Sequence, residues 1–373
     1  MKVVLVTLYD INNFAVRILK TILDRNGHDT RIVAHEIEYG DVEKRMTPDE
    51  QKSLIDEIHS YNPDVVGFTL RSMVYQEFKN LAPKINARII VGGQHPTVCP
   101  EDFDGYTVCV GEGEDVICDI IDGRDGIVYG GMAKDINIIP SMFLHKSSKM
   151  SVITCRGCFF GCSYCYNSLQ RRIISGWKPR RRDVDNVIKE IEILIDNNEL
   201  LEEIVFSDSV FTWDYDWLYE FCKYFKKTGL KFRCFCHFGL CDSKILELIH
   251  DSGCYMVTSG IQGSQRVRKK YFNKHETDDK IIEGAKKIHK SGILGRYDII
   301  RNIPYETEED RESVKDLLDR IPRPFITRSF DLLNNPKTEL TERLLKDNHI
   351  TQEQVQGSCI KSYRINAEFK YYN

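Results

Sequence analysis

Twice along its 373 residues the chain alternates short apolar runs with segments of helical spacing, and this alternation limits the fold more than any other feature. The runs in the first stretch are continuously apolar, which is typical of parallel strands covered on both faces. Segments of helical spacing, such as 13–27, lie between them. This order predicts a doubly wound Rossmann-like α/β domain, and the five expected strands are 2–10, 29–35, 64–70, 87–93 and 106–114.

The alternation starts again at Ser151, after a stretch with Gly and Pro punctuation (122–150) that is expected to be a connector. About six strand–helix units follow, fewer than the eight of a closed TIM barrel, so the sequence predicts an open, partial (βα)6 barrel. The expected parts are a first domain at 1–135, a linker at 136–150, the barrel at 151–350 and a short C-terminal tail at 351–373.

Four cysteines occupy eleven positions in "CRGCFFGCSYC", residues 155–165. Zinc ribbons separate their two CxxC pairs by about 15–20 residues, whereas only three residues lie between these pairs. A redox dithiol needs a single CxxC pair, so four cysteines fit it poorly. Three thiolates at Cys158, Cys162 and Cys165 suit iron–sulfur chemistry, because they can hold three irons of a [4Fe–4S] cube and leave the fourth iron open.

The segment "CFFGCSYC", followed by a strand–helix barrel, resembles the signature of the radical S-adenosylmethionine (SAM) superfamily, which is CxxxCxxC with an aromatic residue before the last cysteine. The resemblance implies that Cys158, Cys162 and Cys165 bind the cluster, while Cys155 is structural. It extends to 206–212, 260–269, 297–310 and 332–350, which are similar to strand-end motifs of that superfamily. The implied SAM contacts are Tyr164, Ser207, Asp208, Ser209, Gln262 and Asp298.

Two loops depart from the superfamily pattern. "GIQGS" is one residue shorter than its usual form, and Leu240 stands where relatives often have arginine. Both loops are expected near the SAM ribose or the substrate.

The strand ends of the first domain carry small and polar residues, and ligands on parallel sheets bind at those ends. No GxGxxG follows the first strand, so NAD is not expected. The segments "PDVVGFTLRS", "IIVGGQHPT" and "VGEGE" instead resemble the cobalamin-binding domain found ahead of many radical SAM enzymes. The implied cobalamin contacts are Asp10, Thr69, Ser72, Gly92, Gly93, Gln94, His95, Gly111, Glu112 and Gly113.

The histidine motif DxHxxG of cobalamin domains is missing, because the corresponding stretch runs from Asp10 to Ala15 without a histidine. Imidazole is the usual donor for such a site, so we expect cobalamin to bind base-off with no histidine under the cobalt. His95 is the nearest candidate, and we expect a hydrogen-bonding role for it. The alternative is a degenerate domain that binds no cofactor.

A formal net charge of −4 argues against a general nucleic-acid binder. No apolar run approaches the ~18 residues of a membrane span, and the N-terminal segment is too quickly polar for a secretory signal. We therefore expect a cytoplasmic protein with no membrane partner. A small-molecule or peptide substrate and a low-potential electron donor, flavodoxin or ferredoxin, are the expected partners. The arginine-rich stretch 171–182 is expected to be a solvated helix start rather than an anion site.

The resemblance implies a cobalamin-dependent radical SAM enzyme. The function we expect is methyl transfer to an unactivated carbon or phosphorus centre, with a 5′-deoxyadenosyl radical generated from SAM and methylcobalamin as the methyl donor. Three alternatives stay open. They are an oxidoreductase or cyclase that uses cobalamin without methyl transfer, a methylthiotransferase-like RNA-modifying enzyme, and a binding protein without catalysis.

Overall fold

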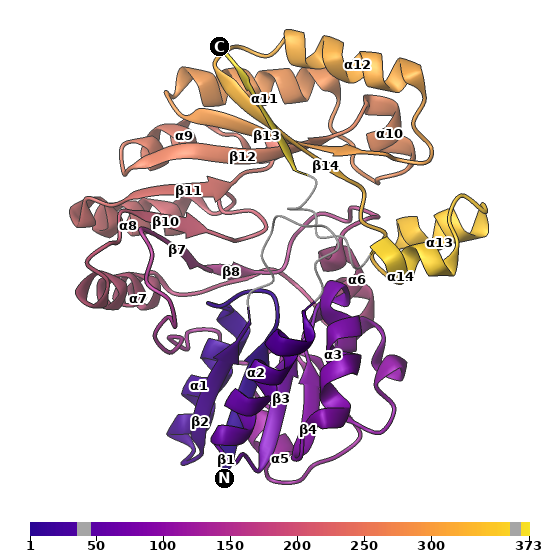
Figure 1. Ribbon diagram of the computed structural model, residues 1–373. Helices are drawn as coiled ribbons and strands as arrows, with labels where there is room; N and C mark the ends of the chain where they lie inside the picture. The colour runs from indigo at the N-terminus through magenta and orange to yellow at the C-terminus, as the bar shows by residue number, and fades with distance from the viewer. Residues whose placement is uncertain (36–45, 359–366) are drawn as a thin grey trace. The chain divides into compact units, whose positions relative to one another are not determined.

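The computed structural model describes residues 1–35, 46–358 and 367–373, and the chain forms two compact units (Figure 1). The first unit contains Met1–His145 together with Leu169–Trp177 and Leu333–Ile365. The second contains Lys146–Ser168, Lys178–Leu332 and Asn366–Asn373. Two later segments of the chain therefore belong to the N-terminal unit.

The sheet of the first unit has six parallel strands in the order β2-β1-β3-β4-β5-β6. Alternate side chains of β1 enter two different cores, with Val4 and Val6 packed on the face of helices α2 and α3, and Val3 and Leu5 on the face of α1 and α5. This is the doubly wound arrangement that the sequence predicted. The strands are β1 Lys2–Thr7, β2 Asp29–Ala34, β3 Val65–Thr69, β4 Arg88–Gly92, β5 Thr107–Gly111 and β6 Ile127–Gly131, and the helices are α1 Phe14–Arg25, α2 Pro48–Ser60, α3 Tyr75–Leu81, α4 Gln94–Val98 and α5 Ile117–Ile121.

Strand β6 lies inside the stretch 122–150 that the sequence marked as a connector. It is an edge strand with exposed Ile127 and Tyr129, so it lacks the continuous apolar run of its buried neighbours. A short edge strand leaves little periodic signal in the sequence.

The sheet of the second unit has the order β15-β14-β13-β12-β11-β10-β7. Strands β7 and β10 to β14 are parallel, and the interleaved helices make the predicted partial (βα)6 barrel. The strands are β7 Lys149–Val152, β8 Cys155–Arg156, β9 Arg180–Arg181, β10 Glu203–Phe206, β11 Lys231–Phe235, β12 Cys254–Gln262, β13 Leu294–Arg301, β14 Phe325–Asp331 and β15 Glu368–Tyr372. The α-helices after α5 are α6 Tyr166–Ile173, α7 Val184–Asn197, α8 Tyr215–Phe225, α9 Ser243–His250, α10 Gln265–Lys270, α11 Asp278–Lys290, α12 Glu308–Asp319, α13 Glu339–Lys346 and α14 Gln352–Ser358.

The C-terminal strand β15 pairs antiparallel with β14, and Figure 1 shows it in yellow along that edge of the sheet. The sequence predicted only a short tail here. Strand β15 has only five residues, and its Phe369 and Tyr371 side chains are exposed. It therefore lacks the buried apolar run by which the other strands are predicted.

A cluster of phenylalanine rings fixes the end of β10, which leads into the site described below. Phe206 stacks on Phe211 with ring centroids 4.6 Å apart, and the rings of Phe221, Phe225 and Phe232 pack around these two at 5.4–6.0 Å. All five side chains are fully buried, and burial of each contributes about 1.5–3 kcal/mol. The chain after Phe206 is thus held on a rigid support.

None of the described helices is long and apolar enough to cross a bilayer.

Candidate cluster and cobalamin sites

The carboxylate of Asp208, just after β10, anchors the start of the cysteine loop. Its Oδ1 accepts the backbone N–H groups of Thr154 (2.7 Å) and Cys155 (2.8 Å), and its Oδ2 accepts the Thr154 hydroxyl. Asp208 is only 1% exposed. Burial raises its pKa, although the charge of Arg181 and these hydrogen bonds act in the opposite direction. The side chain that the sequence assigned to SAM is therefore turned toward the protein backbone.

The three candidate cluster cysteines are half-buried and lie on the loop between β8 and α6. Burial, together with the neighbouring Cys162 and Cys158, raises the pKa of Cys165 to about 11. Cys162 feels Cys158 in the same way, so the three sulfurs lie within electrostatic reach of one another. Gly157, with φ of +88°, takes a left-handed conformation that lets the loop turn.

The three thiols are too widely spread to share one ion. Within the described residues, the only His, Cys, Asp or Glu group whose ligand atoms all lie within 4.8 Å is His95, Cys99 and Asp102. A single zinc ion with bonds of about 2.3 Å to sulfur would draw its ligands closer than that. Three spread thiols fit a multi-iron cluster better.

Cys155 differs from the other three because it is buried in β8. Burial and the nearby Asp208 raise its pKa to about 11.

A second loop, residues 271–276 between α10 and α11, is bonded directly to the cysteine loop. Ser163 donates its N–H to the Phe272 carbonyl (3.0 Å) and its hydroxyl to the Tyr271 carbonyl (2.5 Å). The amide of Asn273 donates to the Gly161 carbonyl at 2.9 Å. The ring of Tyr164 also meets Phe272 edge-on, with centroids 4.8 Å apart. The cysteine loop is thus held by hydrogen bonds and by ring packing against residues 271–276.

Behind this loop lies a buried polar group that sequence reasoning missed. His237 Nε2 lies 2.6 Å from Glu276 Oε1, and Phe160 of the cysteine loop stacks on the His237 ring at 3.5 Å. Burial lowers the pKa of His237, although the adjacent Glu276 carboxylate acts in the opposite direction. Burial alone would raise the pKa of Glu276, but the His237 hydrogen bond and the Lys274 charge bring it down to about 2.

Lys274 belongs to the same group. It is 5% exposed, its ammonium lies 4.0 Å from Glu276, and its charge favours the thiolate form of Cys162. In the sequence these polar residues occur in ordinary loops, so no pattern separates them from solvated ones.

The remaining predicted SAM residues lie just after β10, at the end of β12 and within β13. Ser207 shares a hydrogen bond with Ser151 (Oγ to Oγ, 2.7 Å), and Ser209 accepts from the Asn167 amide at 2.7 Å, just beyond Cys165. Gln262 has φ of +72° at a bulge in β12. Its amide folds over Gly260, where a Cβ would lie 1.9 Å from Gln262 Nε2. Asp298 on β13 receives the Arg328 Nε at 2.9 Å. Direct SAM contacts by these residues stay predictions.

In the first unit, the parallel strands bring the predicted cobalamin residues to one edge of the sheet. Asp10 follows β1, Thr69 and Ser72 follow or end β3, Gly92 to His95 follow β4, and Gly111 to Gly113 follow β5. Strand order reverses between β1 and β3, which is where doubly wound sheets bind ligands. The structure adds Arg71 at this point, with its guanidinium 4.6 Å from the centre of the Tyr9 ring.

Two of the predicted glycines are required by the fold itself. A Cβ on Gly93 would lie 2.8 Å from the Leu70 nitrogen, and one on Gly111 would lie 2.8 Å from the Gly131 oxygen. Gly92 is different, because a Cβ there would meet Cys109 Cβ at an ordinary 3.6 Å. The Glu112 carboxylate is also engaged, since it accepts the Ala133 N–H at 2.6 Å.

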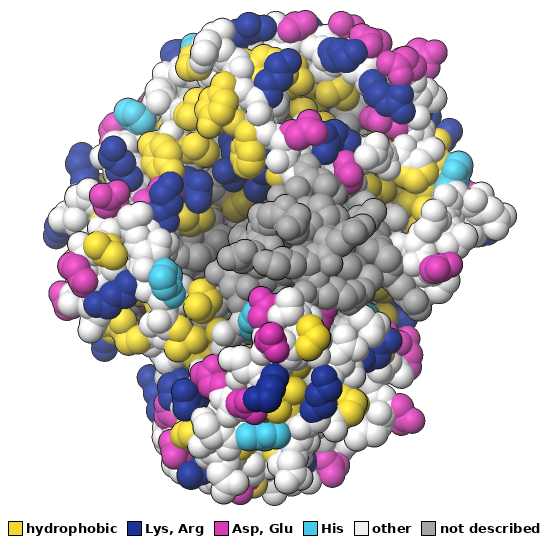
Figure 2. Space-filling view, in the orientation of Figure 1, with side chains coloured by type: hydrophobic (Ala, Val, Ile, Leu, Met, Phe, Trp, Pro, Cys, Tyr) yellow, Lys and Arg dark blue, Asp and Glu magenta, His cyan; other side chains and the backbone are white. Residues whose placement is uncertain are grey.

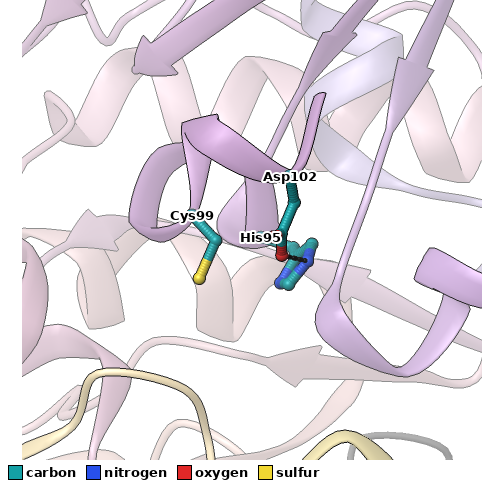
Figure 3. A group of neighbouring side chains, drawn as sticks. All are labelled: His95, Cys99 and Asp102. Carbon is teal, nitrogen blue, oxygen red and sulfur yellow. Dashed lines mark ion pairs between the residues drawn. The ribbon is translucent and has the colours of Figure 1, made fainter. Parts of the chain in front are cut away.

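His95 is held inside the first unit, with Cys99 and Asp102 beside it (Figure 3). Its Nδ1 lies 2.9 Å from the Ser72 hydroxyl and its Nε2 lies 3.1 Å from Asp102. Burial lowers the pKa of His95, against the charge of Asp102. Both ring nitrogens face neighbours in the protein, which agrees with the expected hydrogen-bonding role.

Three ligand types meet at His95, Cys99 and Asp102, yet a cation already lies close by. The Lys337 ammonium pairs with Glu101, and its charge also acts on Asp102 and Cys99. The positive charge of the Lys337 ammonium beside these residues opposes binding of a divalent metal ion.

Two arginines of the stretch 171–182 are structural. Arg181 lies over the rings of Trp213 and Trp217 at 4.6 and 4.4 Å, and Arg182 pairs with Glu190 at 2.6 Å, with both side chains 2% exposed.

Comparison with known proteins agrees with this division of the chain. Residues 152–318 match the family model of the radical SAM superfamily, and residues 2–121 match that of the B12 binding domain. A sequence relative, "Uncharacterized methyltransferase PH0819" of Pyrococcus horikoshii, is 27% identical over 335 aligned positions, covering 78% of this chain and 69% of the relative.

Two solved structures share the fold over most of the chain. The radical SAM methyltransferase TsrM from Kitasatospora setae, with tryptophan substrate and a SAM analog bound, is 17% identical with a TM-score of 0.72, covering 93% of this chain and 76% of TsrM. The cobalamin-dependent SAM radical enzyme OxsB, with aqua-cobalamin and SAM bound, is 16% identical with a TM-score of 0.67, covering 93% of this chain and 55% of OxsB.

The matches identify a radical SAM domain at residues 152–318 and, ahead of it, a B12-binding domain at residues 2–121. The chain shares the fold of TsrM over most of its length. TsrM has also been solved with cobalamin and a [4Fe–4S] cluster bound. Together with the SAM in OxsB, these are the three cofactors that the sequence predicts for this chain.

Proposed function

We propose that this protein is a cobalamin-dependent radical SAM methyltransferase that methylates an unactivated carbon or phosphorus centre of a small molecule. The observation that carries the proposal is the three-thiol loop, which Asp208 and the 271–276 loop hold rigidly in a chain that also has a B12-binding domain. The methyltransferase relative at 27% identity supports methyl transfer over the alternatives.

In this proposal each group of residues has a separate task. Cys158, Cys162 and Cys165 hold the cluster, and Asp208 positions their loop through Thr154. Residues at the carboxyl edge of the first sheet hold cobalamin, with His95 engaged by Ser72 rather than by the metal. Once bound, the cluster supplies an electron for SAM cleavage and cobalamin carries the methyl group. A low-potential electron donor completes the set.

The proposal is tested by product stoichiometry with SAM labelled in its methyl group with deuterium. Reconstituted enzyme, candidate small molecules and a low-potential reductant should yield one 5′-deoxyadenosine and one S-adenosylhomocysteine per labelled product, measured by mass spectrometry. A phosphinate substrate could dispense with hydrogen abstraction from carbon and would still give S-adenosylhomocysteine. The Cys158→Ala variant is the control and should give no 5′-deoxyadenosine. A changed substrate with 5′-deoxyadenosine, but with neither labelled methyl nor S-adenosylhomocysteine, would assign the enzyme to the oxidoreductases or cyclases instead.

A further inference from the structure

Charged side chains lie along one face of the barrel strands β10 to β14. On β13, Tyr297 packs its ring against Phe238 and Phe325 at 5.6 and 5.5 Å, so its neighbours Arg296 and Asp298 lie on the opposite face. Figure 2 shows Lys and Arg side chains, in dark blue, gathered over β11 next to hydrophobic ones. The charged members of this face are Glu203, Arg233, Arg296, Asp298 and Arg328.

Two of the three arginines have a carboxylate partner. The Nε of Arg233 lies 3.1 Å from Glu203 Oε1, and the Nε of Arg328 lies 2.9 Å from Asp298 Oδ1, its register partner on the adjacent strand. Both carboxylates are well buried, with side chains 8% and 9% exposed. Glu203 is further engaged by the Tyr255 hydroxyl at 2.8 Å. The two acids are therefore committed to their partners.

Arg296 has no carboxylate partner among the residues that the structure describes. Its Nε is buried, and it has no hydrogen-bond partner among the residues that the structure describes. Burial, together with the charges of Arg328 and Arg233, lowers the pKa of Arg296 to about 10, and the charge of Asp298 only partly compensates. Among the described residues, these three guanidinium groups have two carboxylate partners between them, and Arg296 is the one without a partner.

An unpaired guanidinium in a partly buried site lowers the stability of the fold, because its lost hydration is not replaced by hydrogen bonds. A guanidinium is also the side chain best suited to grip a carboxylate or phosphate, through paired N–H donors. We propose that Arg296 binds an anionic group, a carboxylate or a phosphate, of the substrate inside the barrel. This inference rests on the proposed function and narrows its substrate class to anionic small molecules.

The test uses the full-length reconstituted protein with inorganic phosphate and acetate as probes. At least one probe should raise the thermal unfolding midpoint of the wild-type protein more than sodium chloride does at equal ionic strength. Arg296→Gln should lose at least tenfold in affinity for that probe, whereas Arg296→Lys should retain part of it. The matched control is Arg25→Gln, which alters an exposed arginine on α1 and should leave the effect intact. Without probe, Arg296→Gln should be at least as stable as the wild type, because it removes an uncompensated charge.

Two results would overturn the inference. One is a probe effect that is absent, or equal in Arg296→Gln and wild type. The other is a loss of SAM affinity in Arg296→Gln, measured by equilibrium dialysis, which would assign Arg296 to the SAM carboxylate instead of the substrate. The proposed function fails separately. If methyl transfer is never observed but Arg296-dependent probe binding with normal SAM affinity is, the anion site stands without the methyltransferase assignment.

Discussion

Replacing Asp208 tests whether this carboxylate positions the cluster loop or contacts SAM. Asp208→Ala would leave the N–H groups of Thr154 and Cys155 buried without an acceptor. Each buried donor without an acceptor costs about 1–3 kcal/mol, so the free energy of unfolding should fall by about 2–6 kcal/mol. Asp208→Asn keeps the shape and one acceptor oxygen, so it should lose about 1–3 kcal/mol. Domains of ordinary stability have a free energy of unfolding of about 5–15 kcal/mol, so either loss is large enough to measure.

The assay is urea unfolding of the apo-protein, followed by iron content after anaerobic reconstitution and by SAM affinity. Both variants should lose stability in the order Ala more than Asn, and both should bind less iron because the loop is no longer held. Asp214→Asn is the matched control, since Asp214 caps α8 through the Trp217 N–H at 3.1 Å and asparagine caps equally well. An Asp208→Asn protein with normal stability and iron but without SAM affinity would refute the positioning role and restore the contact that the sequence suggested.

Three further predictions concern the cysteine loop, the cobalamin edge and acid stability. Alanine in place of any of the three cluster cysteines should abolish SAM cleavage, whereas Cys155→Ala should keep it; zinc as the only bound metal would contradict the assignment. Gly93→Ala should destabilise the first unit through the 2.8 Å approach to Leu70, while Gly92→Ala should fold normally, as measured by thermal unfolding and by the base-off absorption of bound cobalamin. Because the pKa of Glu276 is depressed to about 2, its stabilisation is present above its unfolded pKa of about 4.5 and is lost as pH falls toward 2. Glu276→Gln should reduce this loss of stability at acid pH in the apo-protein, measured as the free energy of unfolding against pH. An unchanged pH dependence would show that the contact with His237 contributes nothing to stability.

The sequence was sufficient wherever a physical pattern repeats. Continuous apolar runs located the buried parallel strands, and parallel strands must place their carboxyl ends at one edge, so Asp10, Thr69 and Gly92 were expected to lie together. Edge strands carry no such pattern. β6 has one exposed face and β15 is exposed along nearly its whole length, and the sequence analysis therefore placed them in a connector and in a tail.

Spacing also locates a residue without giving the direction of its side chain. Asp208 was correctly placed beyond a strand end, but a motif does not reveal that its carboxylate satisfies two backbone N–H groups of the neighbouring strand. The group of Lys274, Glu276 and His237 was missed for a different reason. Its members come from two loops about 40 residues apart, and only tertiary packing brings His237 within 2.6 Å of Glu276.

Arg296 lies between these two cases, because part of its signal is present in the sequence. In "GRYDIIR" the charged residues 296 and 298 are separated by one position in an otherwise apolar strand, so alternation places both on one face. A charged face on an inner strand of a barrel requires compensation, and that requirement alone marks the strand as unusual. The sequence cannot tell which charges compensate one another, since Asp298 lies two residues from Arg296 and three from Arg301. The register of β13 with β14 settles it by placing Arg328 opposite Asp298, and Arg296 keeps the charge that an anionic substrate would neutralise.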